Sequence, residues 1–194
     1  MISSFATGEG FFMTRVHTHN LTEEVTQEMY TTIGTLSAKW SMMEFNLDAL
    51  NTVLYQDFAG NKVEPELPRE FVRKTRFLFK ILESPPTVLL PVKDQLVSIL
   101  GKIGNLSQYR HDIIHGYPSR YEPKTKKFTF VSLSPTPEKT QLQVHERHVT
   151  TQKMQDIGGE ALAIGAALAL ITVELLKSAH GPEDLKDLLS ALGR

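Results

Sequence analysis

The residues best suited to chemistry gather in one short stretch, Tyr109 to Tyr117, of this 194-residue chain. Arg110 supplies a guanidinium that can bind two phosphate oxygens at once, and His111 and His115 supply side chains that titrate near neutral pH. Metal-free cleavage of an RNA phosphodiester requires a base for the 2′-hydroxyl proton, an acid for the leaving oxygen and a cation beside the phosphorane oxygens. The stretch is therefore a candidate catalytic site, with Arg110 as the cation and His115 as the proton carrier.

An apolar stripe predicts the helix that carries this stretch. Arg110 stands where the next aliphatic residue is due, after residues that recur at alternating spacings of four and three: Val92, Leu96, Ile99, Ile103 and Leu106. A guanidinium at a core position is costly unless another group pairs with it or water reaches it. Arg110 and His115 lie about 140° apart on an ideal helix, so we expect them to converge at a partly unwound last turn. Gly116 suits the position just past the helix C-terminus.

Four neighbouring side chains are candidate supports for this pair. Glu44, beside the apolar stripe of an earlier helix, is a candidate carboxylate partner for Arg110, and Asp112 is a local orienter at most. Tyr109 and Tyr117 flank the histidines. In a plainer interpretation, Glu44 simply neutralises Arg110 and the histidines end a helix, where a cation is favourable without any function.

A zinc site is the other alternative for this stretch. His111 and His115, four residues apart, share one helix face and could both bind zinc. The glutamate that follows the first histidine in metalloprotease helices is missing, and His145 and His148 would join the site only in a suitable fold. We therefore expect neither a metal nor a cofactor.

Composition places the chain among ordinary globular proteins. Hydrophobic residues make up 41% and charged residues 22%, and the formal net charge of -1 argues against a surface coated for nucleic acid. Without cysteine, the chain forms no disulfides or thiolate metal sites. We see no signal peptide in Met1–Thr14, and the most apolar run, Ala161–Val173, is shorter than the ~20 residues of a membrane span. The expectation is a soluble cytoplasmic protein without a membrane partner.

The spacing of apolar residues, together with the Gly and Pro residues that end each segment, predicts one all-α domain. It is expected to be an up-and-down helical bundle with a small β-hairpin insertion. A flexible arm is expected at residues 1–20, and the domain at 21–194 with its insertion at about 118–149. Four long helices and a short C-terminal helix are expected at about 21–56, 69–83, 91–115, 151–178 and 183–192. The strands of the hairpin are expected at 127–133 and 141–149.

Two further patterns are interpreted as structural. Gly101 and Gly104 lie inside the third predicted helix, and we expect them to permit the close approach of another backbone. Lys124, Lys126 and Lys127 cluster near the first turn of the insertion and are interpreted as solvated surface. Neither pattern is assigned a function.

The sequence Arg110-His111-x-x-x-His115 resembles the defining motif of the HEPN superfamily, the higher eukaryotes and prokaryotes nucleotide-binding domains. In that family an arginine is followed by a polar residue and, a few residues later, by a histidine. The position of the motif strengthens the likeness, because it ends a long helix late in the predicted bundle, with Trp40 on the first helix. The resemblance covers most of residues 21–178.

The resemblance implies a dimer in which two motifs face each other across a shared cleft. Many HEPN proteins are metal-independent endoribonucleases of toxin–antitoxin, phage-defence or RNA-processing systems, with Arg110 and His115 here as the catalytic pair and His111 as the polar companion. Other members have lost activity. The alternative function is therefore a catalytically silent dimerisation or nucleotide- or RNA-binding module, in which Arg110 is a structural cation.

The implied partners are a second copy of the chain, an RNA substrate and an antitoxin. A dimer answers a chemical need, because cleavage requires both an acid and a base whereas one chain offers one histidine at the end of the motif. A two-fold axis supplies the second histidine. The near-neutral net charge argues against tight autonomous RNA binding, which normally leaves a basic footprint.

Overall fold

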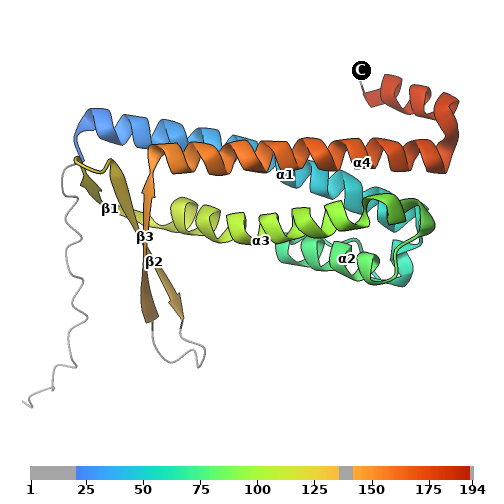
Figure 1. The fold of residues 1–194 in the computed structure, drawn as a ribbon, viewed down its shortest axis with the longest axis horizontal. Coiled ribbons are helices and arrows are strands. Elements are labelled where there is room, and N and C mark those ends of the chain that lie inside the picture. Colours follow the sequence, from blue (N-terminus) through green and yellow to red (C-terminus); the bar gives the residue numbers. More distant parts are fainter. Residues whose placement is uncertain (1–20, 136–141, 193–194) are drawn as a thin grey trace, which may run out of the picture.

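A computed structural model describes residues 21–135 and 142–192, so the predicted arm at 1–20 lies outside the described residues. Helices and strands follow one another along the chain (Figure 1) as α1 (Glu23–Asp57), η1 (Gly60–Lys62), α2 (Phe71–Glu83), η2 (Thr87–Val92), α3 (Lys93–His115), β1 (Tyr117–Glu122), β2 (Lys127–Pro135), β3 (Leu142–Thr150) and α4 (Thr151–Leu192). The two η elements are short 3₁₀ helices. Thr22 caps α1, because its hydroxyl accepts a hydrogen bond from the Val25 N–H at 3.3 Å.

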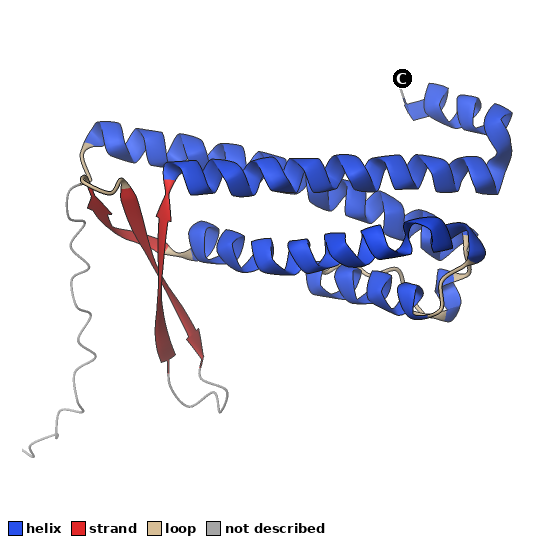
Figure 2. Cartoon of the chain, in the orientation of Figure 1, coloured by secondary structure: helices blue, strands red, loops and turns tan. Residues whose placement is uncertain are grey.

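The prediction of an all-α bundle with a hairpin insertion is wrong. The β region is a three-stranded antiparallel sheet in the order β1-β2-β3, so the fold combines helices with a sheet (Figure 2). The two strands that alternation predicted correspond to β2 and β3. The missed strand is β1, which contains Pro118 and shifts register between Pro118 and Arg120. A strand with such a break has no clean local alternation, and its pairing with β2 defines it.

The two longest helices, α1 and α4, lie side by side along the molecule (Figure 1). The first helix was predicted to carry an apolar stripe of residues spaced by threes and fours from Ile33 to Leu54. Ile33 is partly buried, and the rest of the stripe is buried: Leu36, Trp40, Met43, Leu47, Leu50 and Leu54. Two glycines of α4 allow the helices to approach closely. A Cβ at Gly158 would lie 3.5 Å from Leu36 Cα, and one at Gly165 would lie 3.1 Å from Met43 Cα.

Within the described chain, no backbone approaches Gly101 or Gly104, so the close approach that we expected of them stays a prediction. A Cβ added at either residue would meet no atom within 4 Å in the described parts of the chain. Both lie on the face of α3 opposite its buried stripe, to which Leu96, Ile99 and Ile103 belong. The two glycines therefore leave a smooth, open face on α3.

The element α4 comprises the two helices predicted for the end of the chain, joined at a kink. Its backbone is non-helical at Gly181 (φ 80°, ψ 165°), which marks the predicted break before the C-terminal helix. The segment Thr151–Gly181 is long and apolar enough to cross a membrane, unlike the shorter run considered above, and 39% of its most apolar part is buried in the protein. Core helices of soluble proteins share this length and composition, so the segment alone does not indicate a membrane.

The sheet joins the helices at the C-terminal end of α3. One residue, Gly116, separates α3 from β1, and β3 leads directly into α4. Phe128, Phe130 and Val149 are buried and belong to the same hydrophobic core as the helices. The last turn of α3, which carries the predicted motif, is therefore held at the junction between the helical layer and the sheet.

Candidate functional site

The predicted catalytic pair is brought together at the end of α3. Arg110 Nη1 lies 3.3 Å from His115 Nε2. The helix runs to His115 without an unwound turn, so the length of the arginine side chain, and not the unwinding that we expected, bridges the two residues. Because a guanidinium only donates, this contact requires an unprotonated Nε2, the form in which an imidazole can accept a proton.

Arg110 is half-buried and forms no ion pair with any carboxylate of the described residues. Its Nε is buried without a hydrogen-bond partner there, and its Cζ lies 6.0 Å from the centroid of the Trp40 ring. Glu44 lines the same groove as Arg110 but is not paired with it. The neutralisation of Arg110 by Glu44 is therefore not found, and the guanidinium keeps its charge for a ligand.

A groove of about 330 Å³ adjoins Arg110 on the side of α1 and α2. Its lining comprises Trp40, Glu44, Phe71, Val72, Ser107, Gln108, Arg110 and His111. The rings of Trp40 and Phe71 pack 5.5 Å apart. Trp40 Nε1, like Arg110 Nε, is buried and has no partner among the described residues. Both nitrogen atoms are buried, so they do not face a ligand in the groove. What the groove offers an anionic ligand, such as a phosphodiester, is the positive charge of the Arg110 guanidinium that lines it.

His111 and His115 lie on one exposed face of α3, as their spacing predicted. Their ring centroids are 4.9 Å apart. Among the described residues, no group of three or more His, Cys, Asp or Glu side chains could hold a metal ion. His145 and His148 are three residues apart on β3 and therefore point to opposite faces of the sheet. The zinc alternative thus gains no third ligand from the described parts of the chain.

Asp112 has a structural contact that the sequence did not indicate. Its carboxylate is buried and accepts hydrogen bonds from Arg147 Nε at 2.8 Å, from Arg147 Nη2 at 2.7 Å and from Gln108 Nε2 at 3.0 Å. The Arg147 guanidinium also lies 4.5 Å from the centroid of the Tyr109 ring. Asp112 and Tyr109 therefore join α3 to β3. The sequence offered one indication for Arg147: in a strand every second residue points to the same face, so Arg147 shares the inward face of β3 with Val149.

Gly116 makes the turn from α3 into β1 at close quarters. Its backbone is extended (φ -78°, ψ 148°), not left-handed as is usual for a glycine after a helix. A Cβ there would lie 2.1 Å from the Asp112 carbonyl oxygen and 3.0 Å from Phe130 Cβ. This tight turn puts Tyr117 next to His115, and both line a second cavity of about 330 Å³. Tyr117, a predicted support, is 49% exposed.

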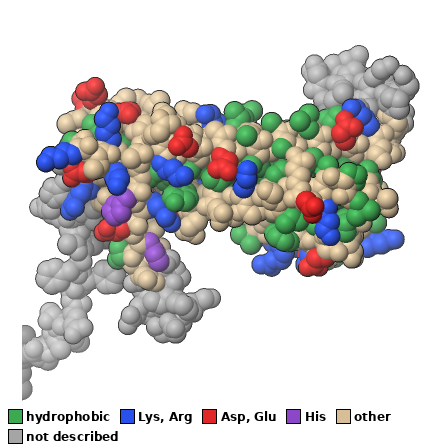
Figure 3. Space-filling model, viewed as in Figure 1, with side chains coloured by type: hydrophobic (Ala, Val, Ile, Leu, Met, Phe, Trp, Pro, Cys, Tyr) green, Lys and Arg blue, Asp and Glu red, His purple; other side chains and the backbone are tan. Residues whose placement is uncertain are grey.

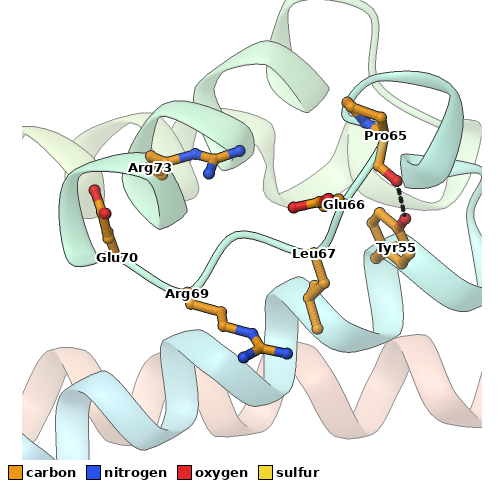
Figure 4. A pocket seen from close by; sticks show the side chains of 7 residues that line it. All are labelled: Tyr55, Pro65, Glu66, Leu67, Arg69, Glu70 and Arg73. Atoms are coloured by element: carbon orange, nitrogen blue, oxygen red, sulfur yellow. Dashed lines mark hydrogen bonds between the residues drawn. The ribbon is translucent and has the colours of Figure 1, made fainter.

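A larger cavity, about 680 Å³, lies away from the motif, between α1, α2 and the loop that joins them. Its lining includes two cations and two carboxylates, Arg69, Arg73, Glu66 and Glu70 (Figure 4). The Tyr55 hydroxyl donates to the Pro65 carbonyl oxygen at 3.0 Å and holds one side of this cavity. With balanced charges and no histidine, it lacks the groups that the predicted chemistry needs.

Comparisons of the chain with protein-family models, curated proteins and solved structures found no match. The HEPN resemblance therefore stays a prediction that rests on the motif. The functional argument has to come from the geometry at the end of α3, where Arg110 and His115 meet beside two cavities.

Proposed function

We propose that the chain is a metal-independent endoribonuclease that acts as a cytoplasmic homodimer, in the manner its HEPN-like motif implies. The observation that carries the proposal is the contact between Arg110 Nη1 and His115 Nε2 at 3.3 Å, made by a guanidinium without a carboxylate partner in the described residues. A structural arginine is normally paired when it is partly buried. An arginine without a carboxylate partner, in contact with a histidine, is better suited to bind and cleave a phosphodiester.

The chemistry follows from these two groups. An imidazole takes the proton of the ribose 2′-hydroxyl, and the 2′-oxygen attacks the neighbouring phosphorus. The bond from phosphorus to the 5′-oxygen breaks, and a second imidazole, which is protonated from the start, donates its proton to that oxygen. The products are a 2′,3′-cyclic phosphate and a 5′-hydroxyl. Arg110 stabilises the charge on the phosphorane oxygens in between.

The second imidazole is supplied by a second copy of the chain. On α3, exposed residues recur at alternating spacings of four and three along the face opposite the core: Val97, Gly101, Gly104, Gln108, His111 and His115. This is the spacing of a helix–helix seam, and the two glycines leave room for a partner helix. A two-fold axis through this face pairs α3 with its own copy and brings both pairs of histidines together.

The test is cleavage of a mixed RNA pool in excess chelator, with the product ends mapped. We expect the wild-type chain to leave cyclic phosphate ends and the Arg110→Ala and His115→Ala variants to lose at least about a hundredfold in rate. His180→Ala is the matched control, because His180 is a histidine paired with Asp57 near the C-terminal end of α4. Undiminished cleavage by the His115→Ala variant would contradict the proposal. No cleavage by any variant would favour the silent binding module.

A further inference from the structure

The second cavity beside His115 has an aromatic lining that the catalytic proposal does not use. Tyr30 of α1 and Tyr117 of β1 both line it, and they are 57% and 49% exposed. Its volume of about 330 Å³ lies within the range of ~300–1,000 Å³ that is usual for small-ligand sites. Ile33, Ile113 and other apolar groups form the rest of the lining. Two exposed aromatic rings around an apolar hollow form a surface on which a flat ring can stack.

The segment that forms the sheet beside this cavity is net basic. Residues 117–153 contain seven Lys and Arg and three Asp and Glu, which gives a formal charge of +4. Because the whole chain has a net charge of -1, the remaining residues carry -5. Figure 3 shows Lys and Arg side chains gathered at the end of the molecule that carries the sheet. The sequence around the sheet is therefore net basic although the whole chain is near neutral. One of the seven cations, Arg147, is neutralised by Asp112 of α3.

The strand register places one cation, Arg120, next to Tyr117 on the face of the sheet that adjoins the cavity. The same face also carries Lys127, Glu122 and Glu146, so its charges are mixed. Arg120 pairs with Thr129, and Thr129 pairs with His148, so these three side chains form a row on one face of the sheet. The Thr129 hydroxyl lies 3.0 Å from His148 Nδ1. The neighbouring row on the same face begins with Tyr117 and ends with Glu146. A polyanion that leaves the cavity along β1 therefore meets Arg120 next.

We propose that Tyr30 and Tyr117 bind an unpaired nucleobase next to His115, and that the RNA strand continues from there along β1 past Arg120. The inference rests on the proposed function and names its substrate class as single-stranded RNA. The nucleotide whose base stacks on the tyrosines has its phosphate beside His115 and Arg110. Duplex RNA is a poor ligand, because a paired and stacked base cannot enter the cavity.

The test is binding of a short fluorescent single-stranded RNA of mixed sequence, measured by anisotropy in excess chelator. All proteins carry His115→Ala so that the RNA stays intact. We expect Tyr30→Ala and Tyr117→Ala each to weaken binding by about 5- to 150-fold, and Tyr30→Phe and Tyr117→Phe to retain it, because stacking needs the ring and not the hydroxyl. Phe45→Ala is the control for an exposed aromatic residue of α1 outside the cavity, and it should leave binding unchanged.

Two further measurements complete the test. Annealing the RNA to its complement should weaken binding, and Arg120→Ala should reduce the slope of log affinity against log salt by about one. The proposal is overturned if the alanine and phenylalanine variants bind equally, if duplex binds as tightly as single strands, or if no single strand binds. The binding assay needs no cleavage, so it tests the nucleobase site even if the chain proves to have no ribonuclease activity. If the chain cleaves RNA but the tyrosine-to-alanine variants bind as tightly as their parent, only the nucleobase site is refuted.

Discussion

Around α2, cations meet carboxylates: Lys74 Nζ lies 2.6 Å from Asp48 Oδ1, Lys80 Nζ lies 2.6 Å from Glu64 Oε1, and Arg73 lies 4.0 Å from Glu64. At the end of α3 the pattern differs, because Arg147 is paired with Asp112 whereas Arg110 contacts His115 and no described carboxylate. Paired cations add to the stability of the folded chain or fix one element against another. A cation without a carboxylate keeps its charge for a ligand.

The region with the unpaired cation has the smaller cavities, and the region with the paired cations has the larger one. The cavity by α2 is about 680 Å³, and each cavity beside the motif is about 330 Å³. In the larger one, Arg73 and Glu66 point across the hollow toward one another (Figure 4). The contrast teaches that size alone is a poor guide to function here. The smaller cavities adjoin the groups that can bind a phosphodiester and move a proton.

The largest effect on stability is expected from Asp112→Ala. The substitution leaves Arg147 without its carboxylate, and we expect a loss of roughly 2–3 kcal/mol, less than for a fully buried pair, because Arg147 is 32% exposed. Arg110→Ala should change stability by less than about 1 kcal/mol, because it breaks no ion pair. Urea unfolding measures both. An equal loss in the two variants would make Arg110 the structural cation of the alternative function.

Gly116→Ala should be the next most damaging change in this region. Its Cβ would clash with the Asp112 carbonyl oxygen, and the strain should cost about 1–3 kcal/mol in urea unfolding. The matched control is Gly104→Ala, which has open space in the described chain and should stabilise the helix by up to about 1 kcal/mol. Similar losses in both variants would show that the turn after α3 is not under the constraint described here.

The next prediction concerns the open face of α3, which is the proposed dimer interface at the motif. We expect the double substitution Gly101→Gln and Gly104→Gln to weaken the proposed dimer by about tenfold or more, because the longer side chains block close approach of a second α3. Sedimentation velocity across a concentration series measures the change. Gly159→Gln on α4 is the control, since a Cβ there also meets nothing within 4 Å. A dimer unaffected by the α3 substitutions would exclude this face as the interface.

The smallest effect is expected around α2, and it depends on pH. The hydrogen bond from Lys80 holds the pKa of the Glu64 carboxyl below its usual value, with the charges of Lys80, Arg73 and Arg76 adding to the effect. A lowered pKa in the folded state means that this contribution to stability is present above the unfolded pKa and is lost as pH falls through the folded pKa. Glu64→Gln should therefore lower the thermal midpoint slightly at pH 7.

Measuring the thermal midpoint as a function of pH tests whether the effect of Glu64→Gln comes from the charge of the carboxylate. The difference in thermal midpoint between wild type and Glu64→Gln should shrink as the pH falls, because the wild-type carboxyl then becomes protonated and loses its attraction for Lys80. Lys80→Gln should give the same trend. A difference that stays constant between pH 7 and pH 3 would mean that the ion pair does not contribute.

Much of the helical layer was predictable because its signals are local. Spacings of three and four placed the buried stripes of α1 and α3, and alternation placed β2 and β3. The strand β1 was missed because it acquires its identity from pairing with β2. Sequence did not show what each glycine meets, because the same residue type is a contact with α1 at Gly158 and an open surface of the described chain at Gly104. Only the position of a neighbouring helix distinguishes the two.

The sequence by itself determined that Arg110 interrupts a buried stripe five residues before His115, because helical spacing is a local property. The structure showed that the two side chains meet without an unwound turn. Tertiary structure decided the rest. It paired Asp112 with Arg147 from a strand 35 residues later and left Glu44 unpaired with Arg110. It also brought Tyr30 of α1 to the cavity at His115. Such contacts depend on how α3, α1 and the sheet pack, and no short-range pattern encodes that packing.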